Sequence, residues 1–373
     1  MASIRKRPDG QWRARYRDPA GKERARHFDR KVDAQRWLDG VTSTVVSGAY
    51  VDPKAGRTIF EDWAKHVDSV SVARRPTTRS RDATLIRTRV LPTFGPRPLA
   101  TITNTNVKAW VAKLVADGLA PTTIRKCYQL LARVMGEAVE SGLIAVTPCR
   151  KVALPRAEMR DTTLLTPEQV AALADAIEPR YRALVLCAAY TGLRWGELAG
   201  LEVRRVDFLR RRIDVASVLI EVDGDLTLGA PPKTKASRSS VSVPAPIIEV
   251  LAQHVAEYPD PDRGLMFTSE NGALLRRSNF RRRVWQPALR DAGLPMGATF
   301  HDLRHACASW LIHAGANPLE VAQKLRHTRV TTTLSVYGHL FEGTDARLDG
   351  LLEDTFAGAG AEISRTTRGL NAL

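Results

Sequence analysis

Hydrophobic residues recur every three to four positions over most of the chain, which is the spacing of the buried face of a helix. Between residues 58 and 150 this spacing predicts four helices. Their inward positions are Ile59, Trp63 and Val67, then Leu85, Val90 and Leu91, then Val107, Trp110, Val111 and Leu114, and finally Ile124, Cys127, Leu131, Val134 and Ala138. Four such helices can bury one modest core, so we expect a helical domain here.

The first 55 residues follow a different pattern, in which hydrophobic and polar positions alternate. Residues 11–17 and 23–28 alternate on either side of a turn at residues 18–22, which predicts a β-hairpin. A helix is expected next, with inward positions at Val32, Ala34, Trp37 and Leu38. Lys and Arg are about twice as frequent here as Asp and Glu. The basic hairpin is either simply solvated or lies on DNA, and we favour DNA contact through Arg5, Lys6, Arg13, Arg15 and Arg17.

The second half of the chain is again mostly helical. Residues 166–169 have the composition of a helix start with a capping box. The helix expected from about residue 180 is almost wholly apolar and therefore buried, and it is expected to end at Gly192, with Arg194 at the head of the next helix.

Residues 206–244 interrupt this helical pattern with an alternation of period two. Strands are predicted at 212–220, 225–229 and 239–243, in one small antiparallel sheet. Residues 275–290 then predict a basic helix, which is either solvated or in contact with phosphates. Its inward positions are Phe280, Val284, Trp285 and Leu289.

Composition narrows the class of protein. The chain has 373 residues, which favours two or three domains, and its net charge of +16 indicates a polyanionic partner. Nucleic acid is favoured over a membrane, because there is no lipidation motif or long basic amphipathic anchor and the longest apolar run, residues 183–190, is too short to span a bilayer. The charged amino terminus predicts no signal peptide. Four cysteines far apart in apolar surroundings are typical of reduced core residues in a cytoplasmic protein: Cys127, Cys149, Cys187 and Cys307.

Candidate chemistry is concentrated in residues 299–339. This stretch contains His301, Arg304, His305, His327 and Tyr337. With Thr299 as the expected N-cap of a helix, His301 and Arg304 lie three residues apart and share one helix face. Permanent cations, imidazoles and a phenol together are the groups needed for phosphoryl transfer to a protein nucleophile.

Two further short helices are expected in this stretch. Residues 318–325 form an amphipathic segment that delivers His327 just beyond its end, and its inward positions are Leu319, Val321, Ala322 and Leu325. A run of three threonines at 331–333 is expected to cap the helix that carries Tyr337.

Simpler interpretations exist for single residues in this stretch. A histidine three residues before an arginine is common by chance, and His305 and His313 are expected to be ordinary surface or packing residues. His301 and His305 have the i, i+4 spacing of zinc ligands, but no HExxH glutamate and no CxxC pair accompany them, so we expect no metal site. The combination of residue types, rather than any single one, favours phosphoryl transfer.

Three motifs resemble those of the tyrosine recombinases, the phage integrase family. Residues 191–201 (TGLRWGELAGL) resemble the first conserved box, and HDLRH with KLRHTRVTTTLSVYGHL, within residues 301–340, resembles the second. Residues 231–244 (PPKTKASRSSVSVP) resemble the lysine-bearing β-hairpin between the boxes. One departure is that the family usually has glycine before the last histidine, where this chain has Arg326.

The resemblance implies a multidomain, mainly helical fold with small antiparallel sheets. Residues 1–55 would be a β-β-β-α domain that binds arm-type DNA sites, and residues 58–150 the helical core-binding domain. Residues 160–345 would be the integrase-type catalytic domain of mixed α and β structure. Apart from the resemblance, Leu348, Leu351 and Leu352 favour contact of the tail, residues 346–373, with a neighbouring subunit.

The resemblance also implies roles for single residues. Arg194 and Arg304 would grip the phosphate, and Tyr337 would attack it to form a 3′-phosphotyrosyl intermediate and a free 5′-hydroxyl. Lys233, with Lys235 as the alternative, would protonate the leaving oxygen, His301 would accept the phenolic proton, and His327 would bind the phosphate or position the tyrosine. Apart from the resemblance, the position of Glu197 one turn after Arg194 indicates a carboxylate that holds a neighbouring arginine or histidine. No metal ion and no nucleotide cofactor are implied.

We therefore expect a site-specific DNA recombinase, most simply the integrase of a phage or mobile element, acting in the bacterial cytoplasm as a homotetramer on double-stranded attachment sites. Host bending and directionality factors are possible partners. Further DNA contacts are expected at Arg125, Lys126, Arg238 and Arg281. The alternatives are an Xer-like resolvase, an enzyme like the type IB topoisomerases, and a DNA-binding regulator without catalysis. The basic amino-terminal unit favours the integrase.

Overall fold

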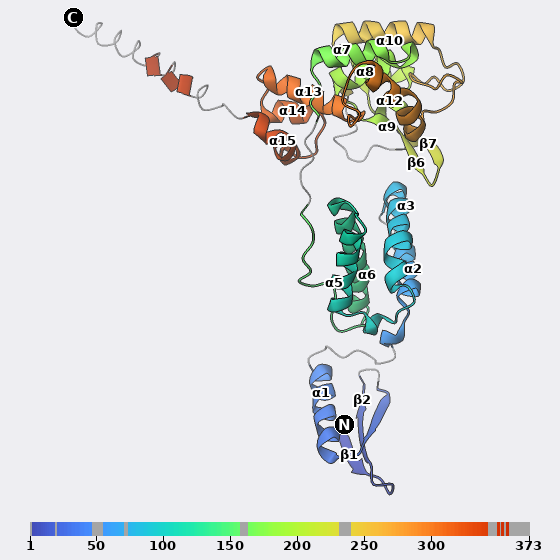
Figure 1. The fold of residues 1–373 in the computed structure, drawn as a ribbon, viewed down its shortest axis with the longest axis vertical. Helices are drawn as coiled ribbons and strands as arrows, with labels where there is room; N and C mark the ends of the chain where they lie inside the picture. Colours follow the sequence, from blue (N-terminus) through green and yellow to red (C-terminus); the bar gives the residue numbers. More distant parts are fainter. Residues whose placement is uncertain are drawn as a thin grey trace, which may run out of the picture. The chain divides into compact units, whose positions relative to one another are not determined.

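A computed structural model of the chain describes residues 2–18, 21–46, 55–70, 74–156, 163–230 and 240–341, together with 349–350, 352–353 and 356–357. The chain divides into two compact units, Met1–Met159 and Arg160–Leu373 (Figure 1). Lys233, Lys235 and Arg238 lie outside the described residues, as does most of the predicted tail.

The amino-terminal part of the first unit is a three-stranded antiparallel sheet followed by a helix. Its elements are β1 (Ser3–Lys6), β2 (Trp12–Arg17), β3 (Glu23–Phe28) and α1 (Lys31–Val46). The predicted hairpin is confirmed. Ala34 and Leu38 are buried as predicted, but Val32 is 62% exposed, and its prediction was wrong. Two residues before Ala34, Val32 lies about 200° around the helix from it and therefore points to the opposite side.

Strand register divides the basic side chains of this sheet between its two faces. Arg5 pairs with Arg13, so these two side chains share one face with Arg15 and Arg17. Lys6 pairs with Trp12 on the other face, where its ammonium lies 5.9 Å from the centre of the indole ring. Lys6 therefore lies on the opposite face of the sheet from the four arginines, and its predicted contact with DNA stays a prediction.

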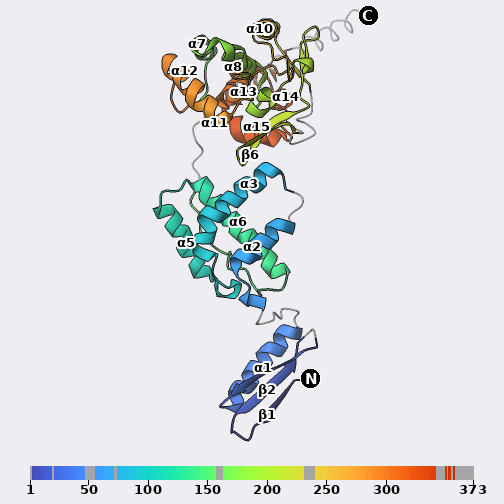
Figure 2. The ribbon, with the colours of Figure 1, turned by 90° about the vertical axis from the view of Figure 1, so that its right-hand side faces the viewer.

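The helical part of the first unit has one hydrophobic core and matches the four predicted helices. Its main elements are α2 (Phe60–Val70), α3 (Pro76–Leu85), η2 (Ile86–Val90), α4 (Leu91–Phe94), α5 (Asn104–Ala116) and α6 (Pro121–Glu140), with short 3-10 turns η1 (Ala55–Arg57) and η3 (Leu99–Thr101). Helix α6 packs against both α2 and α5 (Figure 2). Phe94 and Trp110 meet edge to face in this core.

Two prolines explain the wide turns that interrupt otherwise regular helices. Pro92 and Pro287 lack an N–H, so each leaves a carbonyl one turn earlier without its usual donor. In both places the helix widens to a π-turn just before the proline: η2, and η6 (Arg281–Trp285). The predicted basic helix at 275–290 is therefore α11 (Arg277–Phe280), η6 and α12 (Gln286–Asp291), and its four predicted inward residues are buried.

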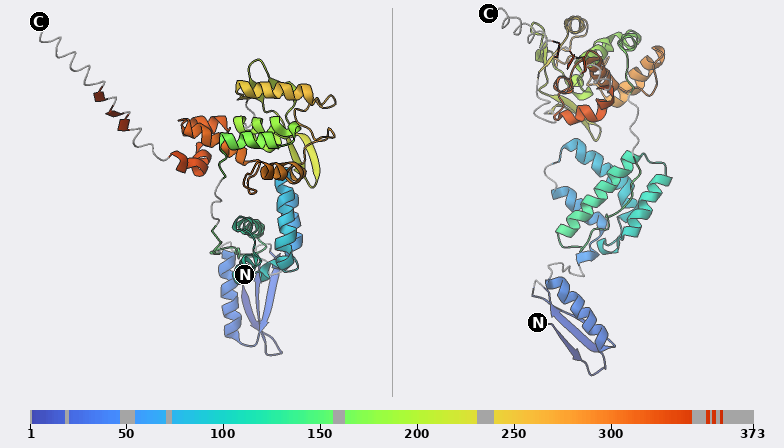
Figure 3. Two further views of the ribbon diagram at one scale, coloured as in Figure 1. Left: turned by 45° about the horizontal axis from the view of Figure 1, so that its top comes forward. Right: turned by 90° about the vertical axis from the view of Figure 1, so that its left-hand side faces the viewer.

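The second unit is organised around α8 (Pro179–Thr191), which packs against α7 (Pro167–Ala176), α10 (Ala245–Glu257) and α13 (Asp302–His313). Figure 3 shows α10, in yellow, beside α8, in green. The capping box at residues 166–169 and the buried character of α8 are confirmed. Helix α9 (Trp195–Ala199), the turn η4 (Val203–Arg205), α14 (Pro318–Lys324), α15 (Val330–Tyr337) and η7 (Gly338–Phe341) complete the helices described here.

The strands of this unit form two sheets, whereas the sequence predicted one. Strands β4 (Val206–Asp207), β5 (Arg212–Asp214) and β8 (Ser240–Ser242) pair in one sheet, and β6 (Val218–Val222) pairs with β7 (Asp225–Ala230) in the other. The single strand predicted at 212–220 is therefore split. Alternation shows that a segment is extended but does not identify its pairing partner, so the change of sheet after Asp214 left no mark in the pattern.

Two glycines let β6 approach α9 closely. A Cβ at Gly196 would lie 2.8 Å from Leu219 O, and one at Gly200 would lie 2.6 Å from Leu219 N. Side chains at either position would push the strand away from the helix that begins next to Arg194. The small hairpin therefore supports the helix that carries part of the candidate site.

Three predictions near the carboxyl end need correction. Leu319 is 54% exposed, because it lies in the first turn of α14 on the side away from Val321. The three threonines lie inside α15, whose N-cap is Arg329. Helix α13 has His301 rather than Thr299 as its N-cap residue, because the Asp302 carboxylate accepts hydrogen bonds from Thr299 and holds it one turn earlier. No described helix combines the length and hydrophobicity needed to cross a bilayer.

Candidate active site

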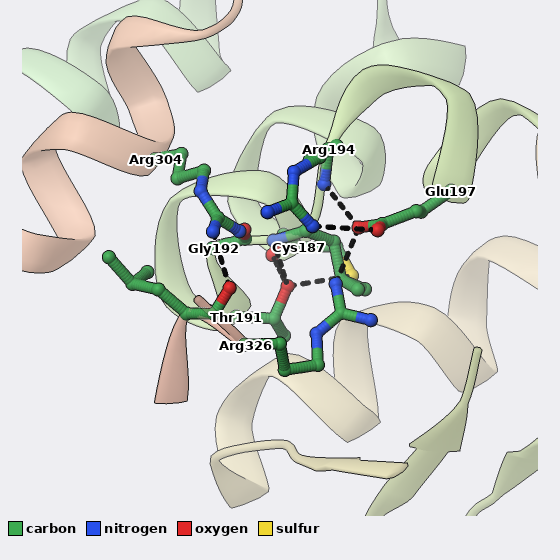
Figure 4. Close-up of polar contacts among 9 residues, drawn as sticks. Cys187, Thr191, Gly192, Arg194, Glu197, Arg304 and Arg326 are labelled. Carbon is green, nitrogen blue, oxygen red and sulfur yellow. Dashed lines mark hydrogen bonds and ion pairs between the residues drawn. The ribbon is translucent and has the colours of Figure 1, made fainter. Parts of the chain in front are cut away.

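Arg194 and Glu197 form the first part of the site, at the start of α9. The Glu197 carboxylate accepts from Arg194 N at 2.8 Å and from Arg194 Nη1 at 3.0 Å, so it both caps the helix and holds the guanidinium. The Arg194 side chain is 36% exposed, whereas Glu197 is buried. The guanidinium of Arg194 can therefore contact a ligand while it stays hydrogen-bonded to Glu197 (Figure 4).

Arg304 forms the second part and is fixed by backbone oxygens. Its Nη1 donates to Gly192 O and its Nη2 to Leu325 O, and its side chain approaches that of Arg194 (Figure 4). Gly192 has φ +66, and a Cβ there would collide with Leu325, so glycine is required at the end of α8. Burial, followed by the charge of Arg194, lowers the pKa of Arg304 to about 9, so that this guanidinium is still charged at neutral pH.

Arg326 joins the site from the loop after α14, and no role for it was predicted from the sequence. Its Nη2 lies 2.5 Å from Glu197 Oε2, and its side chain is 3% exposed. Burial alone would raise the pKa of Glu197, but the charges of Arg326 and Arg194 outweigh it and hold that pKa below its usual value. Glu197 is therefore a carboxylate shared by two arginines.

His301 and His327 approach this cluster from two directions. Partial burial of each ring, followed by nearby positive charge, lowers the pKa of both to about 4, although the His301 residue as a whole is still exposed and His327 is half-buried. For His327 those charges include Arg304 and Arg194, and its Nδ1 lies 2.8 Å from Thr333 Oγ1. Both imidazoles are therefore neutral at pH 7 and able to accept or donate a hydrogen bond.

Tyr337, the last residue of α15, is held by a histidine that we had expected to be an ordinary surface or packing residue. Its hydroxyl lies 2.7 Å from His305 Nδ1, and it is only 2% exposed. Burial raises the pKa of Tyr337 to about 12, although Arg304 opposes this, and burial lowers that of His305. Sequence spacing shows only the neighbours of His305 on its own helix, so it could not reveal this partner 32 residues away.

The structure thus gathers most of the predicted residues into one cluster. Electrostatic contacts connect Arg194, His301, Arg304 and His327, and Arg304 also acts on Tyr337. Lys233 and Lys235 lie outside the described residues. Lys324, at the end of α14, donates to Ser242 O on β8, the strand that follows residues 231–239. Within the described ranges, no group of three or more His, Cys, Asp or Glu side chains could hold a metal ion.

The predicted DNA-contact residues differ in their exposure and in their contacts within the protein. Arg5, Arg17, Lys126 and Arg281 are exposed. Arg13 and Arg15 share Glu23 as an ion-pair partner, at 3.2 Å and 3.5 Å. Arg125 is partly buried, and its Nε donates to Pro155 O at 3.0 Å, which favours a structural contribution beside any contact with phosphate.

We expect acid to destabilise the DNA-free protein through His301 and His327. Both have an ordinary pKa of 6.5 and a folded value of about 4, so between these values the unfolded chain binds more protons. Their contribution to stability is complete above about pH 6.5 and is lost as the pH falls towards 4. The free energy of unfolding, measured in urea, should fall by about 1 to 3 kcal/mol between those limits, allowing for solvent screening around the rings. A His301→Gln/His327→Gln variant should show a shallower fall, and an equal slope would contradict the assignment.

Comparison with known proteins identifies the family. The sequence matches the phage integrase family over residues 163–343 and the phage integrase N-terminal domain over residues 2–46. It is 30% identical over 348 residues to the integrase of Mycobacterium phage D29, a match that covers 87% of this chain and 89% of that integrase. The chain belongs to the phage integrase family. It is an enzyme, a site-specific tyrosine recombinase, as its motifs predicted.

Other relatives of this recombinase agree. The integrase of Mycobacterium phage FRAT1 is 32% identical over 258 residues, covering 67% of this chain and 75% of that protein. Among solved structures, the Tn1549 transposon integrase in complex with transposon right end DNA matches with a TM-score of 0.69 at 20% identity, over 79% of this chain and 100% of the other. A lambda integrase tetramer bound to a Holliday junction matches with a TM-score of 0.56 at 18% identity, over 88% and 96%. The predicted fold class is confirmed.

Proposed function

We propose that this recombinase integrates and excises the genome of a phage or other mobile element, by cutting and rejoining double-stranded DNA at attachment sites. Relatives that match over most of their length include the integrases of Mycobacterium phages D29 and FRAT1, and the match to the phage integrase N-terminal domain supports an arm-binding role for residues 1–55. Arg5, Arg13, Arg15 and Arg17 share one face of the sheet, which suits contact with the phosphates of a duplex.

Two guanidinium groups are the proposed phosphate clamp. Attack on phosphorus places charge on the non-bridging oxygens, and planar cations that cannot lose their proton at neutral pH stabilise that charge with fixed geometry. Arg304 is held by two carbonyls, and Arg194 by Glu197, so neither has to be ordered when DNA binds. His327, if it accepts the Thr333 hydroxyl at Nδ1, carries its proton at Nε2 and can donate it to a phosphate oxygen.

Tyr337 is the proposed nucleophile. Its phenolic oxygen forms a bond to phosphorus, the bond to the 5′-oxygen breaks, and a 3′-phosphotyrosyl ester and a free 5′-hydroxyl result. His305 lies 2.7 Å from the hydroxyl and is our revised choice for the group that accepts its proton. His301, whose ring meets His305 edge-on at 4.9 Å, remains the second candidate. Lys233, with Lys235 as the alternative, is proposed to protonate the leaving oxygen.

The proposed partners follow from the same reaction. Exchange of four strands requires four active sites, so we propose a homotetramer on two duplexes, formed on DNA in the cytoplasm of a bacterial host. Residues 346–373 are proposed to dock on a neighbouring subunit, and a host bending factor and a directionality factor are proposed to set the direction of the reaction. Residues 58–150 are proposed to clamp the core site.

The observation that carries this proposal is the Tyr337–His305 hydrogen bond within a cluster that also contains two fixed arginines. A nicked suicide substrate, which loses the short strand after cleavage, should trap the full-length protein on DNA, and sequencing the trapped DNA should reveal one recurring site. Two such sites on one plasmid should then recombine. Relaxation of supercoils without exchange would favour the topoisomerase alternative, and DNA binding without an adduct would favour a regulator.

A further inference from the structure

Arg326 has a backbone conformation that requires explanation. Its φ is +55°, in the left-handed region that side-chain-bearing residues rarely adopt. Glycine would adopt this conformation at no steric cost. Such an outlier persists only when other contacts hold it in place, and it therefore points to a contact made by the side chain.

That contact is with Glu197, 129 residues earlier in the chain. Glu197 Oε2 accepts from Arg326 Nη2 at 2.5 Å and from Arg194 N at 2.8 Å, while Oε1 accepts from Arg194 Nη1 at 3.0 Å. Figure 4 shows the carboxylate between the two guanidinium groups. Arg326 thus contacts the residue that holds Arg194, and is itself buried.

The charges of this cluster indicate what Arg326 contributes. Glu197 alone would neutralise Arg194, which would leave Arg304 as the single uncompensated guanidinium. With Arg326 present, three positive charges face one carboxylate, so two positive charges remain for the phosphate. A phosphodiester carries one negative charge and gains a second as an oxyanion adds to phosphorus, so two uncompensated charges match the developing transition state.

Arg326 also connects two segments that carry the site. Leu325 O accepts from Arg304 Nη2, and Arg326 Nη2 donates to Glu197. The loop of residues 325–327, which ends at His327, therefore contacts Arg304 on one side and Glu197 on the other. Anchoring the loop through Arg326 fixes the start of the segment that leads to His327.

We propose that Arg326 is a positioning residue for strand cleavage: by sharing Glu197 with Arg194, it keeps the charge of Arg194 available to the scissile phosphate and fixes the loop before His327. This inference rests on the proposed cleavage reaction.

The test measures single-turnover adduct formation by the full chain on the nicked suicide substrate. Arg326→Gly should slow adduct formation about 100-fold, the scale of a misplaced reacting group, while DNA affinity changes little. The double variant Arg326→Gly/Glu197→Gln should react faster than Arg326→Gly, because removing the carboxylate returns two uncompensated charges to the phosphate. A residue that only supported the fold would show no such recovery.

Arg211→Gly is the matched control, because Arg211 also has a positive φ, of 52°, but is exposed in the turn between β4 and β5. It should react like the wild type. Should Arg326→Gly fail to fold, Arg326→Gln gives the same comparison without the backbone change. Wild-type rates in Arg326→Gly, or a double variant no faster than the single one, would overturn the inference. Absence of an adduct with the wild type would instead overturn the proposed cleavage reaction.

Discussion

Tyr337→Phe is expected to form no covalent adduct with the suicide substrate, while binding the same DNA as tightly as the wild type does. Phenylalanine keeps the ring packed in its pocket but removes the only atom proposed to bond to phosphorus. No neighbouring hydroxyl is expected to substitute, because the loss of a nucleophile that forms a covalent intermediate removes the pathway rather than slowing it. The adduct is read on a denaturing gel, and DNA binding by a mobility shift.

Tyr190→Phe is a suitable control for that experiment. Tyr190 is a half-buried tyrosine of the second unit, and its ring centre lies 5.1 Å from that of Trp310. It should form the adduct at the wild-type rate. Tyr337→Phe should lose about 1 kcal/mol of stability with the His305 hydrogen bond, which leaves the protein folded. An adduct of normal yield with Tyr337→Phe would refute Tyr337 as the nucleophile.

Local chemistry explains which features of the fold could be predicted from the sequence. The buried α8, its end at Gly192 and the position of Arg194 at the head of α9 all depend on neighbours within one or two turns. The apolar spacing of α8, the glycine at position 192 and the carboxylate of Glu197, three residues after Arg194, are visible in the sequence itself. The same holds for the hairpin of the first unit and for the helices of residues 58–150.

Contacts between distant segments could not be predicted in this way. The partner of His305 is on α15, and that of Arg326 is in α9. Contacts between residues so far apart in the sequence leave no periodic pattern of residue types. The replacement of glycine by Arg326 was visible, but the sequence alone could not show whether the arginine points to solvent or to a buried carboxylate. The strand predicted at 212–220 failed for a related reason, because strand pairing is a long-range choice.

These differences bear on how the site is made ready for DNA. The groups that the motifs identified are those proposed to touch the phosphate, whereas the two residues that only the structure revealed, His305 and Arg326, hold other groups. His305 keeps the Tyr337 hydroxyl in position through a hydrogen bond, and Arg326 does the same for the Glu197 carboxylate. Preorganisation of this kind lowers the cost of ordering the site when the substrate binds.

Arg194→Gln provides the second large effect, and Arg205→Gln is its matched control. The two arginines have nearly equal exposure, 36% and 37%, and each pairs with a carboxylate, Glu197 at 3.0 Å and Asp214 at 2.9 Å. Glutamine at 194 can still hydrogen-bond but carries no charge, so cleavage should fall by about 10³- to 10⁵-fold, the range for an arginine that stabilises phosphoryl transfer. Arg205→Gln should cleave at the wild-type rate. Because Arg326 would remain to neutralise Glu197, Arg194→Gln should unfold at nearly the wild-type temperature, so that a loss of cleavage reports on the phosphate and not on the fold. Equal rates for the two variants would show that Arg194 does not stabilise the transition state.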